Sequence, residues 1–211
     1  MKAIILAGGL GTRLRPLTYT MPKPMVLLGS KPLIHFTVAQ AANAGFDQII
    51  ITTNFMAEMI ADYFQRVDLG VPVLCVEEKT AMGTAGCVKN LENLLTETFA
   101  VIPGDSITDL DLRVLIDFHK SQKGVATLAL KAVDSTSEFG IVQLDSNARI
   151  LRFQEKPKPE ESFSNLANTG YYVFDPSVLE FIPAGEPFDF SFGLFPQLLE
   201  AKLPHVWIPH Q

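Results

Sequence analysis

Short apolar runs alternate with longer stretches of mixed apolar and polar residues from the N-terminus to Leu130. The apolar runs predict strands over Ala3–Ala7, Ile49–Thr53, Val73–Val76, Phe99–Ile102 and Ala126–Leu130. The stretches between them predict helices over Leu33–Ala44 and Phe55–Arg66, from near Thr84, and over Leu112–Ser121. Continuously apolar strands separated by helices indicate an α/β fold with a doubly wound, mostly parallel, Rossmann-like sheet that helices cover on both faces.

The pattern changes after about residue 135, where short strands predominate. Strands are predicted over Ile141–Leu144, Ile150–Phe153 and Tyr171–Phe174, with a hairpin turn at Asp145-Ser146-Asn147 and an exposed loop over Lys156–Ser164. The Phe-rich stretch Phe188–Phe195 predicts a buried packing segment. No repeat or linker divides the chain, so we expect one domain over residues 1–211 with a small β-rich subregion at its C-terminal end.

The basic residues near the N-terminus contrast with the acidic character of the whole chain. The formal net charge is -6 and the pI is about 5.2, yet the first 46 residues contain five basic side chains and no acid. The acidic balance argues against a nucleic-acid groove or a polybasic membrane surface. The concentrated cations predict instead a small polyanionic ligand.

The remaining composition predicts a cytoplasmic protein. The opening MKAIILAGG is too short for the apolar region of a signal peptide, and no run reaches the roughly 18 apolar residues of a membrane span. Cys75 and Cys87 are too few for a disulfide framework and lack metal-ligand spacing. The four histidines share no ligand spacing and adjoin no nucleophile, so we expect them in the core or on the surface.

A glycine-rich loop follows the first predicted strand. Gly8, Gly9 and Gly11 let the backbone approach a ligand closely. Thr12 adds a hydroxyl donor. Open α/β sheets bind ligands at such loops, at the carboxyl ends of parallel strands. The loop lacks the Gly-Lys-Ser/Thr end of a Walker motif, and Arg13 replaces the third glycine of a dinucleotide fingerprint, so the sequence predicts a phosphate site of another kind.

Three cations accompany this loop. Arg13 and Arg15 carry permanent charge and can bind phosphate oxygens in a bidentate manner. Lys23 lies between two prolines on a stiff segment and adds a point charge. Three such cations suit a triphosphate, because no acidic residue near them in the sequence neutralises them. The alternative is a glycine-rich turn whose arginines pair at the surface with distant carboxylates.

The run LAGGLGTRLRPLT, followed by Pro22-Lys23-Pro24, resembles the signature of the sugar-1-phosphate nucleotidyltransferases. Later motifs of that family have counterparts here in the same order. They are Gly83-Thr84-Ala85-Gly86, Gly104-Asp105, Phe139-Gly140, Phe153-Gln154-Glu155-Lys156-Pro157 and Asn168-Thr169-Gly170-Tyr171-Tyr172. The resemblance implies a nucleotide-binding part over residues 1–134, a sugar-phosphate-binding part over residues 135–211, and a reaction that joins an NTP and a sugar 1-phosphate with release of pyrophosphate.

The resemblance implies a nucleotide site in the first part. Its binding residues would be Leu6, Ala7, Gly8, Gly9, Gly11, Thr12, Arg13, Glu78, Gly83 and Thr84. Arg13, Lys23 and Asp105 would be catalytic, with Asp105 holding Mg²⁺ between the nucleotide phosphates. The GTAG stretch, where glycines would let the backbone pass under a flat base, is similar to that of the guanylyltransferases for mannose 1-phosphate. If Glu78 reaches the base edge, its acceptor-only carboxylate suits guanine.

The resemblance also implies a sugar-phosphate site in the second part. Glu155 would accept hydrogen bonds from sugar hydroxyls, and Lys156 would pair with the 1-phosphate. Gly140 and Asn168 would line the same pocket. Without the resemblance, Glu155 and Lys156 would be read as an ordinary surface pair of small energetic weight.

Alternatives remain open at three points. GTP and mannose 1-phosphate are the expected substrates, and thymidylyl or uridylyl transfer to glucose 1-phosphate is the alternative within the family. Asp109 and Asp111 form a DxD that a nucleotide-sugar-dependent glycosyltransferase would use, but Asp111 suits the cap of the helix that follows it. A noncatalytic regulatory or nucleotide-sugar-sensing subunit would keep the fold and bind without turnover.

One motif of the family has no counterpart in the chain. The family usually carries a second metal aspartate in a Trp-x-Asp-x-Gly segment after the last strand, and this chain ends at Pro209-His210-Gln211. A strand around Val206-Trp207-Ile208 leads toward that position, so we expect a chain truncated at its C-terminal end. The resemblance further implies a homo-oligomer.

Overall fold

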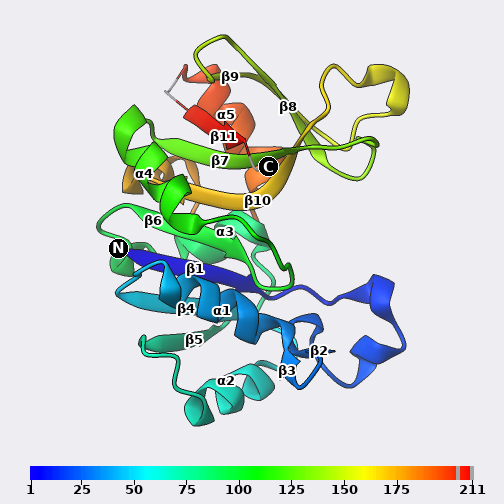
Figure 1. The fold of residues 1–211 in the computed structure, drawn as a ribbon, viewed down its shortest axis with the longest axis vertical. Helices are drawn as coiled ribbons and strands as arrows, with labels where there is room; N and C mark the ends of the chain where they lie inside the picture. Colours follow the sequence, from blue (N-terminus) through cyan, green and yellow to red (C-terminus); the bar gives the residue numbers. More distant parts are fainter. Residues whose placement is uncertain (203–204, 210–211) are drawn as a thin grey trace. The chain divides into compact units, whose positions relative to one another are not determined.

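Residues 1–202 and 205–209 are described here in a computed structural model of the chain (Figure 1). His210, which was expected in the core or on the surface, and Gln211, the last residue of the chain, lie outside these residues. The chain forms two compact units. The first unit consists of Met1–Ala81 and Phe99–Leu112, and the second of Met82–Thr98 and the residues from Arg113 onward. The boundary between a nucleotide-binding part over residues 1–134 and a sugar-phosphate-binding part over residues 135–211 stays a prediction.

The first unit, which is described throughout, contains four parallel strands. They are β1 (Lys2–Ala7), β4 (Gln48–Thr53), β5 (Val73–Glu77) and β6 (Phe99–Pro103). β1 lies between β4 and β6, and β5 pairs with the other side of β4 (Figure 1). Ile4, Ile5 and Ile50 have no exposed surface, because the strands of a covered parallel sheet are buried on both faces. The predicted α/β class with a mostly parallel sheet is confirmed.

Helices connect these strands as the sequence predicts. α1 (Leu33–Asn43) packs against β1 and β4, and α2 (Ala57–Arg66) packs against β5. α2 begins later than predicted, because Met56 adopts a left-handed backbone conformation with a φ of 50°. Between β1 and α1 lie elements that were not predicted. They are 3₁₀ turns over Thr12–Leu14, Leu17–Tyr19 and Lys23–Met25, and the short strands β2 (Leu27–Leu28) and β3 (Lys31–Pro32).

The second unit contains a mixed set of strands. β7 (Ala126–Ala132) pairs antiparallel with β10 (Leu166–Phe174) and parallel with β11 (His205–Pro209). β8 (Gly140–Leu144) and β9 (Ile150–Glu155) form the predicted hairpin. Its turn is closed by the amides of Asn147 and Arg149, each of which donates to Asp145 Oδ1 over 2.8 Å. The α-helices described in this unit are α3 (Gly83–Lys89), α4 (Leu112–Gln122), which starts at the unit boundary, and α5 (Phe195–Glu200).

β10 is longer than the predicted strand. The sequence indicated a strand over Tyr171–Phe174 only, but β10 begins at Leu166. Its pairing with β7 is interrupted by a bulge between Asn168 and Tyr172, where Gly170 has a φ of 87°. A bulge breaks the alternation of side chains along a strand, so the strand pattern is lost before residue 171.

The histidines with described side chains, His35 and His119, are core residues as expected. His119 Nδ1 lies 2.9 Å from Thr127 Oγ1, and burial lowers the pKa of its imidazole. His35 lies between Tyr63 OH and Lys31 Nζ, each 2.9 Å away. Burial lowers the pKa of His35, and the Lys31 charge lowers it further. None of the described helices is long and apolar enough to cross a membrane.

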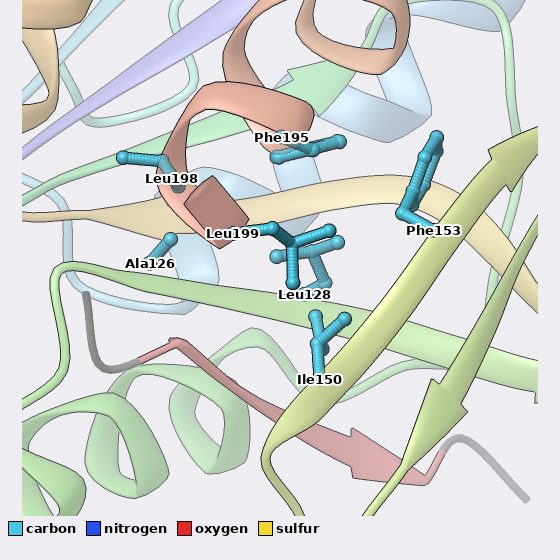
Figure 2. Close-up of a pocket in the computed structure, with 7 residues that line it drawn as sticks. All are labelled: Ala126, Leu128, Ile150, Phe153, Phe195, Leu198 and Leu199. Atoms are coloured by element: carbon cyan, nitrogen blue, oxygen red, sulfur yellow. The ribbon is translucent and has the colours of Figure 1, made fainter. Parts of the chain in front are cut away.

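An aromatic cluster forms the core of the second unit. Phe190 stacks on Phe174 and on Phe195, with ring centroids 5.3 and 6.1 Å apart. Tyr172 contacts all three rings. Figure 2 shows Phe153 and Phe195 beside aliphatic side chains of β7, β9 and α5. These residues line a gap of only about 10 Å³. Such a gap has room for about one water molecule and its described lining is apolar, so these side chains pack closely around it.

Phe192 is the exception in this segment. The stretch Phe188–Phe195 was expected to be buried, but Phe192 is 73% exposed. Residues Phe190–Leu194 form a π-helical turn, whose wide spacing puts Phe190 and Phe195 on one face and Phe192 on the other. The expectation is correct for Phe190 and Phe195 and wrong for Phe192.

Phe195→Ala is predicted to lower the free energy of unfolding by about 3–5 kcal/mol, because it removes a buried ring and leaves a cavity. Phe192→Ala, at an exposed position of the same segment, is the matched control and should change that free energy by no more than about 0.5 kcal/mol. Urea denaturation followed by circular dichroism measures both. Equal losses in the two variants would contradict this description of the core.

Candidate active site

The loop after β1 leads into an open cleft of the first unit, with a volume of about 390 Å³. Its lining residues are Leu6, Ala7, Gly9, Gly11, Thr12, Arg13, Leu14, Lys23, Pro24 and Asp105. All of them except Leu14 and Pro24 are predicted site residues. The cleft lies where the parallel strands β1 and β6 end, which is where ligands were expected to bind.

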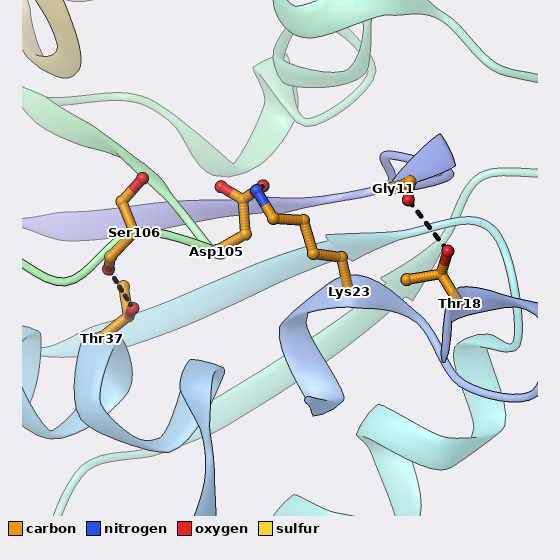
Figure 3. A network of polar contacts seen from close by, with 6 residues as sticks. All are labelled: Gly11, Thr18, Lys23, Thr37, Asp105 and Ser106. Carbon is orange, nitrogen blue, oxygen red and sulfur yellow. Dashed lines mark hydrogen bonds and ion pairs between the residues drawn. The ribbon is translucent and has the colours of Figure 1, made fainter. Parts of the chain in front are cut away.

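The glycines of this loop have different surroundings. Gly11 has a φ of 57°, and a Cβ atom there would lie 2.8 Å from Cβ of Lys23. Thr18 Oγ1 donates to the carbonyl of Gly11 over 2.9 Å and so fixes the turn (Figure 3). A Cβ atom on Gly9 would have none of the described atoms within 4 Å. Gly11 is therefore required by the fold of the loop, whereas Gly9 leaves space in the cleft.

Lys23 and Asp105 meet in this cleft (Figure 3) although 82 residues separate them. Lys23 Nζ donates to Asp105 Oδ2 over 2.6 Å in an ion pair, with the side chains 33% and 36% exposed. The amide of Gly104 donates to the carbonyl of Leu6 over 2.9 Å, which ties the turn before Asp105 to β1. The acidic partner that the first 46 residues lack thus comes from the end of β6.

Two polar side chains of α1 hold the segment that follows Asp105. Thr37 Oγ1 donates to the carbonyl of Ser106 over 3.3 Å (Figure 3). Gln40 Nε2 donates to the carbonyl of Leu110 over 2.7 Å. Sequence reasoning missed both residues. A signal was present for Thr37, which is a polar residue at helical spacing among the apolar positions that α1 buries.

The two arginines of the loop differ in their surroundings. Arg13 lines the cleft and makes no hydrogen bond or ion pair within the part of the chain that the structure describes. The guanidinium of Arg15 lies over the ring of Tyr19, 5.2 Å from its centroid, and Arg15 is not a lining residue. Of the two arginines expected to bind phosphate, only Arg13 lines the cleft.

Asp105 supplies the carboxylate of the cleft lining. The DxD residues Asp109 and Asp111 do not line it, and Asp111 directly precedes α4, where a helix cap was expected. No group of three or more His, Cys, Asp or Glu side chains in the described residues could hold a metal ion. A single carboxylate beside a phosphate site nevertheless suits Mg²⁺, which takes its other ligands from phosphate oxygens and water.

Glu78 lies beside the glycine loop. A Cβ atom on Gly8 would be 3.5 Å from Glu78 Oε1 and 3.6 Å from Cβ of Asn54. The predicted nucleotide residues Gly8 and Glu78 are therefore neighbours at the ends of β1 and β5. Asn54, at the end of β4, was missed because a single asparagine after a strand belongs to no motif.

Gly83 and Thr84 belong to the second unit and have structural partners there. A Cβ atom on Gly83 would be 2.6 Å from the carbonyl oxygen of Phe188. Thr84 donates to Asp189 Oδ1 from its amide over 3.0 Å and from its hydroxyl over 2.9 Å. The glycine thus admits the Phe188 backbone, which is a different reason from the base contact that was expected. Contact of Gly83 and Thr84 with the nucleotide stays a prediction.

The residues predicted to bind the sugar phosphate also lie in the second unit. Gly140 and Glu155 are partners across β8 and β9. A Cβ atom on Gly140 would be 2.5 Å from Glu155 Oε2, so the glycine leaves space for this carboxylate. Lys156 has a φ of 44°, and its amide donates to the carbonyl of Phe139 over 2.9 Å. This turn fixes the main chain of the predicted Glu155 and Lys156 pair.

Asn168 is held by the bulge of β10. Its Nδ2 donates to Tyr172 OH over 2.8 Å, and its Oδ1 accepts from the amide of Gly170 over 3.2 Å. Burial raises the pKa of the Tyr172 hydroxyl, the hydrogen bond from Asn168 lowers it, and the negative charge of Glu155 raises it again. Tyr172 therefore interacts with two residues of the predicted sugar-phosphate site, and sequence reasoning had not placed it there.

The family model described as nucleotidyl transferase matches residues 2–210. A UTP–glucose-1-phosphate uridylyltransferase of Synechocystis sp. is 39% identical over 97% of this chain and 56% of its own length. A mannose-1-phosphate guanyltransferase of Saccharomyces cerevisiae is 36% identical over 96% of this chain and 57% of its own length. A probable mannose-1-phosphate guanylyltransferase 1 of Oryza sativa is 34% identical over 99% of this chain and 60% of its own length. The chain thus spans 56% to 60% of the length of these relatives.

Solved structures share this fold. A putative glucose-1-phosphate thymidylyltransferase from Bacillus anthracis, in complex with a sucrose, has a TM-score of 0.88 at 26% identity. The match covers 100% of this chain and 87% of that one. HddC from Yersinia pseudotuberculosis has a TM-score of 0.82 at 26% identity, over 99% of this chain and 89% of that one. The chain therefore belongs to the nucleotidyl transferase family, and its resemblance to the sugar-1-phosphate nucleotidyltransferases is confirmed.

Proposed function

We propose that the protein joins a nucleoside triphosphate and a sugar 1-phosphate into a nucleoside-diphosphate sugar, with release of pyrophosphate. The observation that carries this proposal is the cleft at the ends of β1 and β6, where the glycine loop, Arg13 and Lys23 meet the carboxylate of Asp105. GTP and mannose 1-phosphate are the proposed substrates, supported by relatives named guanylyltransferases and by the acceptor character of Glu78. UTP and glucose 1-phosphate are the second candidate pair, because a 39% identical relative is named for them.

The proposed reaction needs no general base. A phosphate monoester is largely ionised near neutral pH, so an oxygen of the sugar 1-phosphate can attack the α-phosphorus directly. As this P–O bond forms, the bond from the α-phosphorus to the bridging oxygen of the leaving group breaks, and pyrophosphate departs with the electron pair. The protein contributes positioning and neutralisation of charge.

The proposed contribution of the basic side chains is to place positive charge beside the phosphate groups of both substrates. Arg13 lines the cleft without a partner in the described residues, so its guanidinium is available to bind the triphosphate in a bidentate manner. Lys23 adds a point charge beside it. Lys156 is proposed to hold the phosphate of the nucleophile, and Glu155 the sugar hydroxyls.

Asp105 is the proposed ligand of Mg²⁺. Its carboxylate belongs to the cleft lining and is accessible there. When bound, Mg²⁺ supplies neutralisation of the charge that develops on the phosphate oxygens.

The setting of the reaction is part of the proposal. We place it in the cytoplasm, in keeping with Cys75 and Cys87, which are thiols that form no disulfide. A homo-oligomer, which the family resemblance implies, is a proposal of the same kind. The activity of the whole protein is likewise proposed, since the chain spans 56% to 60% of the length of the relatives named above.

Pyrophosphate release in the presence of Mg²⁺ tests the proposed function. GTP, UTP, dTTP, CTP and ATP are each combined with mannose 1-phosphate and with glucose 1-phosphate, and GTP with mannose 1-phosphate should give the highest rate. A different preferred pair would overturn the substrate assignment and keep the reaction. Nucleotide binding without pyrophosphate release would overturn the reaction and favour the noncatalytic sensing subunit.

Arg13→Ala is expected to lower kcat/KM by about 10²–10³-fold, the usual loss when one group that stabilises the transition state is removed. Arg15→Ala removes the same charge from the same loop but from a side chain that lies over Tyr19 instead of lining the cleft. It should stay within about threefold of the parent, since loop changes away from the ligand have small effects. Similar losses in both variants would point to net charge and not to a contact of Arg13.

The loop glycines provide a second test, through a pair of alanine variants. Gly9→Ala should leave the free energy of unfolding within about 0.5 kcal/mol of the parent, because its added Cβ meets none of the described atoms. It should nevertheless weaken nucleotide binding. Gly11→Ala should cost about 1–2 kcal/mol for the left-handed conformation alone, and more for the contact with Lys23. Nucleotide affinity that is unchanged in Gly9→Ala would argue against phosphate binding at this loop.

A further inference from the structure

Asn54 lies in a row of three residues at the edge of the first sheet. The parallel register brings the last residues of β1, β4 and β5 to one level. The residues that follow these strands are Gly8, Asn54 and Glu78. Gly8 and Glu78 are predicted nucleotide-binding residues, whereas no pattern in the sequence assigned a role to Asn54.

Asn54 continues the pairing of β4 and β5 one step beyond their ends. The amide of Glu78 donates to the carbonyl of Thr53 over 2.7 Å, as in a main-chain ladder. The next hydrogen bond comes from a side chain, because Asn54 Nδ2 donates to the carbonyl of Glu78 over 2.7 Å. The peptide groups on both sides of the Glu78 Cα atom are thereby held, which fixes the direction in which its side chain leaves the backbone.

This arrangement holds the Glu78 carboxylate near the cleft. Oε1 of Glu78 and Cβ of Asn54 lie 3.5 and 3.6 Å from the place of a Cβ atom on Gly8. The chain neighbours of Gly8, which are Ala7 and Gly9, line the cleft. Neither Asn54 nor Glu78 is among the lining residues of the cleft. Asn54 contacts the carbonyl of Glu78, so its influence on a ligand that Glu78 binds would pass through that residue.

We infer that Asn54 is a positioning residue that sets the base preference of the nucleotide site by holding Glu78. The inference rests on the proposed function, because it needs Glu78 to face the base. A carboxylate only accepts hydrogen bonds, so it suits the two adjacent N–H donors of guanine. Uracil presents one N–H between two carbonyl oxygens, which repel a carboxylate. Recognition of this kind requires the carboxylate to be held within about 0.5 Å, and the Asn54 hydrogen bond supplies the main-chain part of that restraint.

Dissociation constants of GTP and UTP, measured by calorimetry on the 211-residue chain without sugar phosphate, test this inference. In Asn54→Ala the constant for GTP should rise about five- to tenfold, which corresponds to one hydrogen bond, and that for UTP should change by less than about twofold. Turnover at saturating GTP and the KM for mannose 1-phosphate should stay within about twofold of the parent.

Thr53→Val is the matched control. It removes a hydrogen bond of 3.3 Å from Thr53 Oγ1 to the carbonyl of Val76, between the same two strands and one residue earlier. It should lower the melting temperature and leave the ratio of the GTP and UTP constants unchanged. The same shift of that ratio in Thr53→Val and Asn54→Ala would show a general effect of strand pairing and overturn the inference.

A double-mutant cycle with Glu78→Ala separates positioning from a direct effect of Asn54. If Asn54 acts through the Glu78 side chain, Asn54→Ala should change the GTP to UTP ratio by less than about twofold in the Glu78→Ala background. Additive effects on that ratio would overturn the inference, and so would equal weakening of both nucleotides in Asn54→Ala alone.

The outcomes also distinguish this inference from the proposed function. A chain that prefers GTP in binding but releases no pyrophosphate would overturn the proposed reaction, and the binding cycle would still decide the role of Asn54. A chain that releases pyrophosphate but binds GTP and UTP equally would keep the reaction and overturn the role of Asn54. A chain that binds no nucleotide would overturn both.

Discussion

The pairing of β1 with β4 on one side and with β6 on the other is the constraint on which the candidate site depends. In a parallel sheet the carboxyl ends of the strands meet at one edge, and here Leu6 pairs with both Thr52 and Pro103. The glycine loop and the turn that carries Asp105 therefore start at the same level. Lys23, on the segment that follows the loop, reaches Asp105 across 82 positions of sequence. Buried isoleucines of these strands form part of the core, so the site is built at the edge of a closely packed sheet.

The ion pair between Lys23 and Asp105 contributes little to the stability of the fold, and its main effect is to hold both charged groups in the cleft. Both side chains are about one third exposed, so water and salt screen their attraction, and pairs of this kind contribute about 0–1 kcal/mol. Their position matters more, because each charge is held in the cleft. Arg13 and Lys23 outnumber Asp105 in its lining although the chain carries a net charge of -6. This local excess of positive charge favours a phosphate ligand.

The parts of the molecule that could be predicted have local signals in the sequence. Runs of isoleucine mark β1 and β4, and the glycines and Arg13 of the loop that follows β1 lie close together in the sequence. The parts that could not be predicted depend on partners distant in sequence. Asn54 donates to a main-chain carbonyl, which is present at every residue and leaves no trace in the sequence. The exposure of Phe192 depends on a π-helical turn, and the start of β10 is concealed by a bulge. Apolar composition reveals neither.

The glycines show why a motif does not by itself identify a ligand contact. Gly11 has a left-handed conformation and packs against Lys23, and Gly83 admits the carbonyl of Phe188. Packing within the chain explains both. Gly9 differs, because it lines the cleft and its missing side chain would meet none of the described atoms within 4 Å. Space that no described side chain fills, next to two cations, is what a phosphate group needs in order to reach main-chain amides. The argument for phosphate binding therefore depends on Gly9, and not on the number of glycines in the loop.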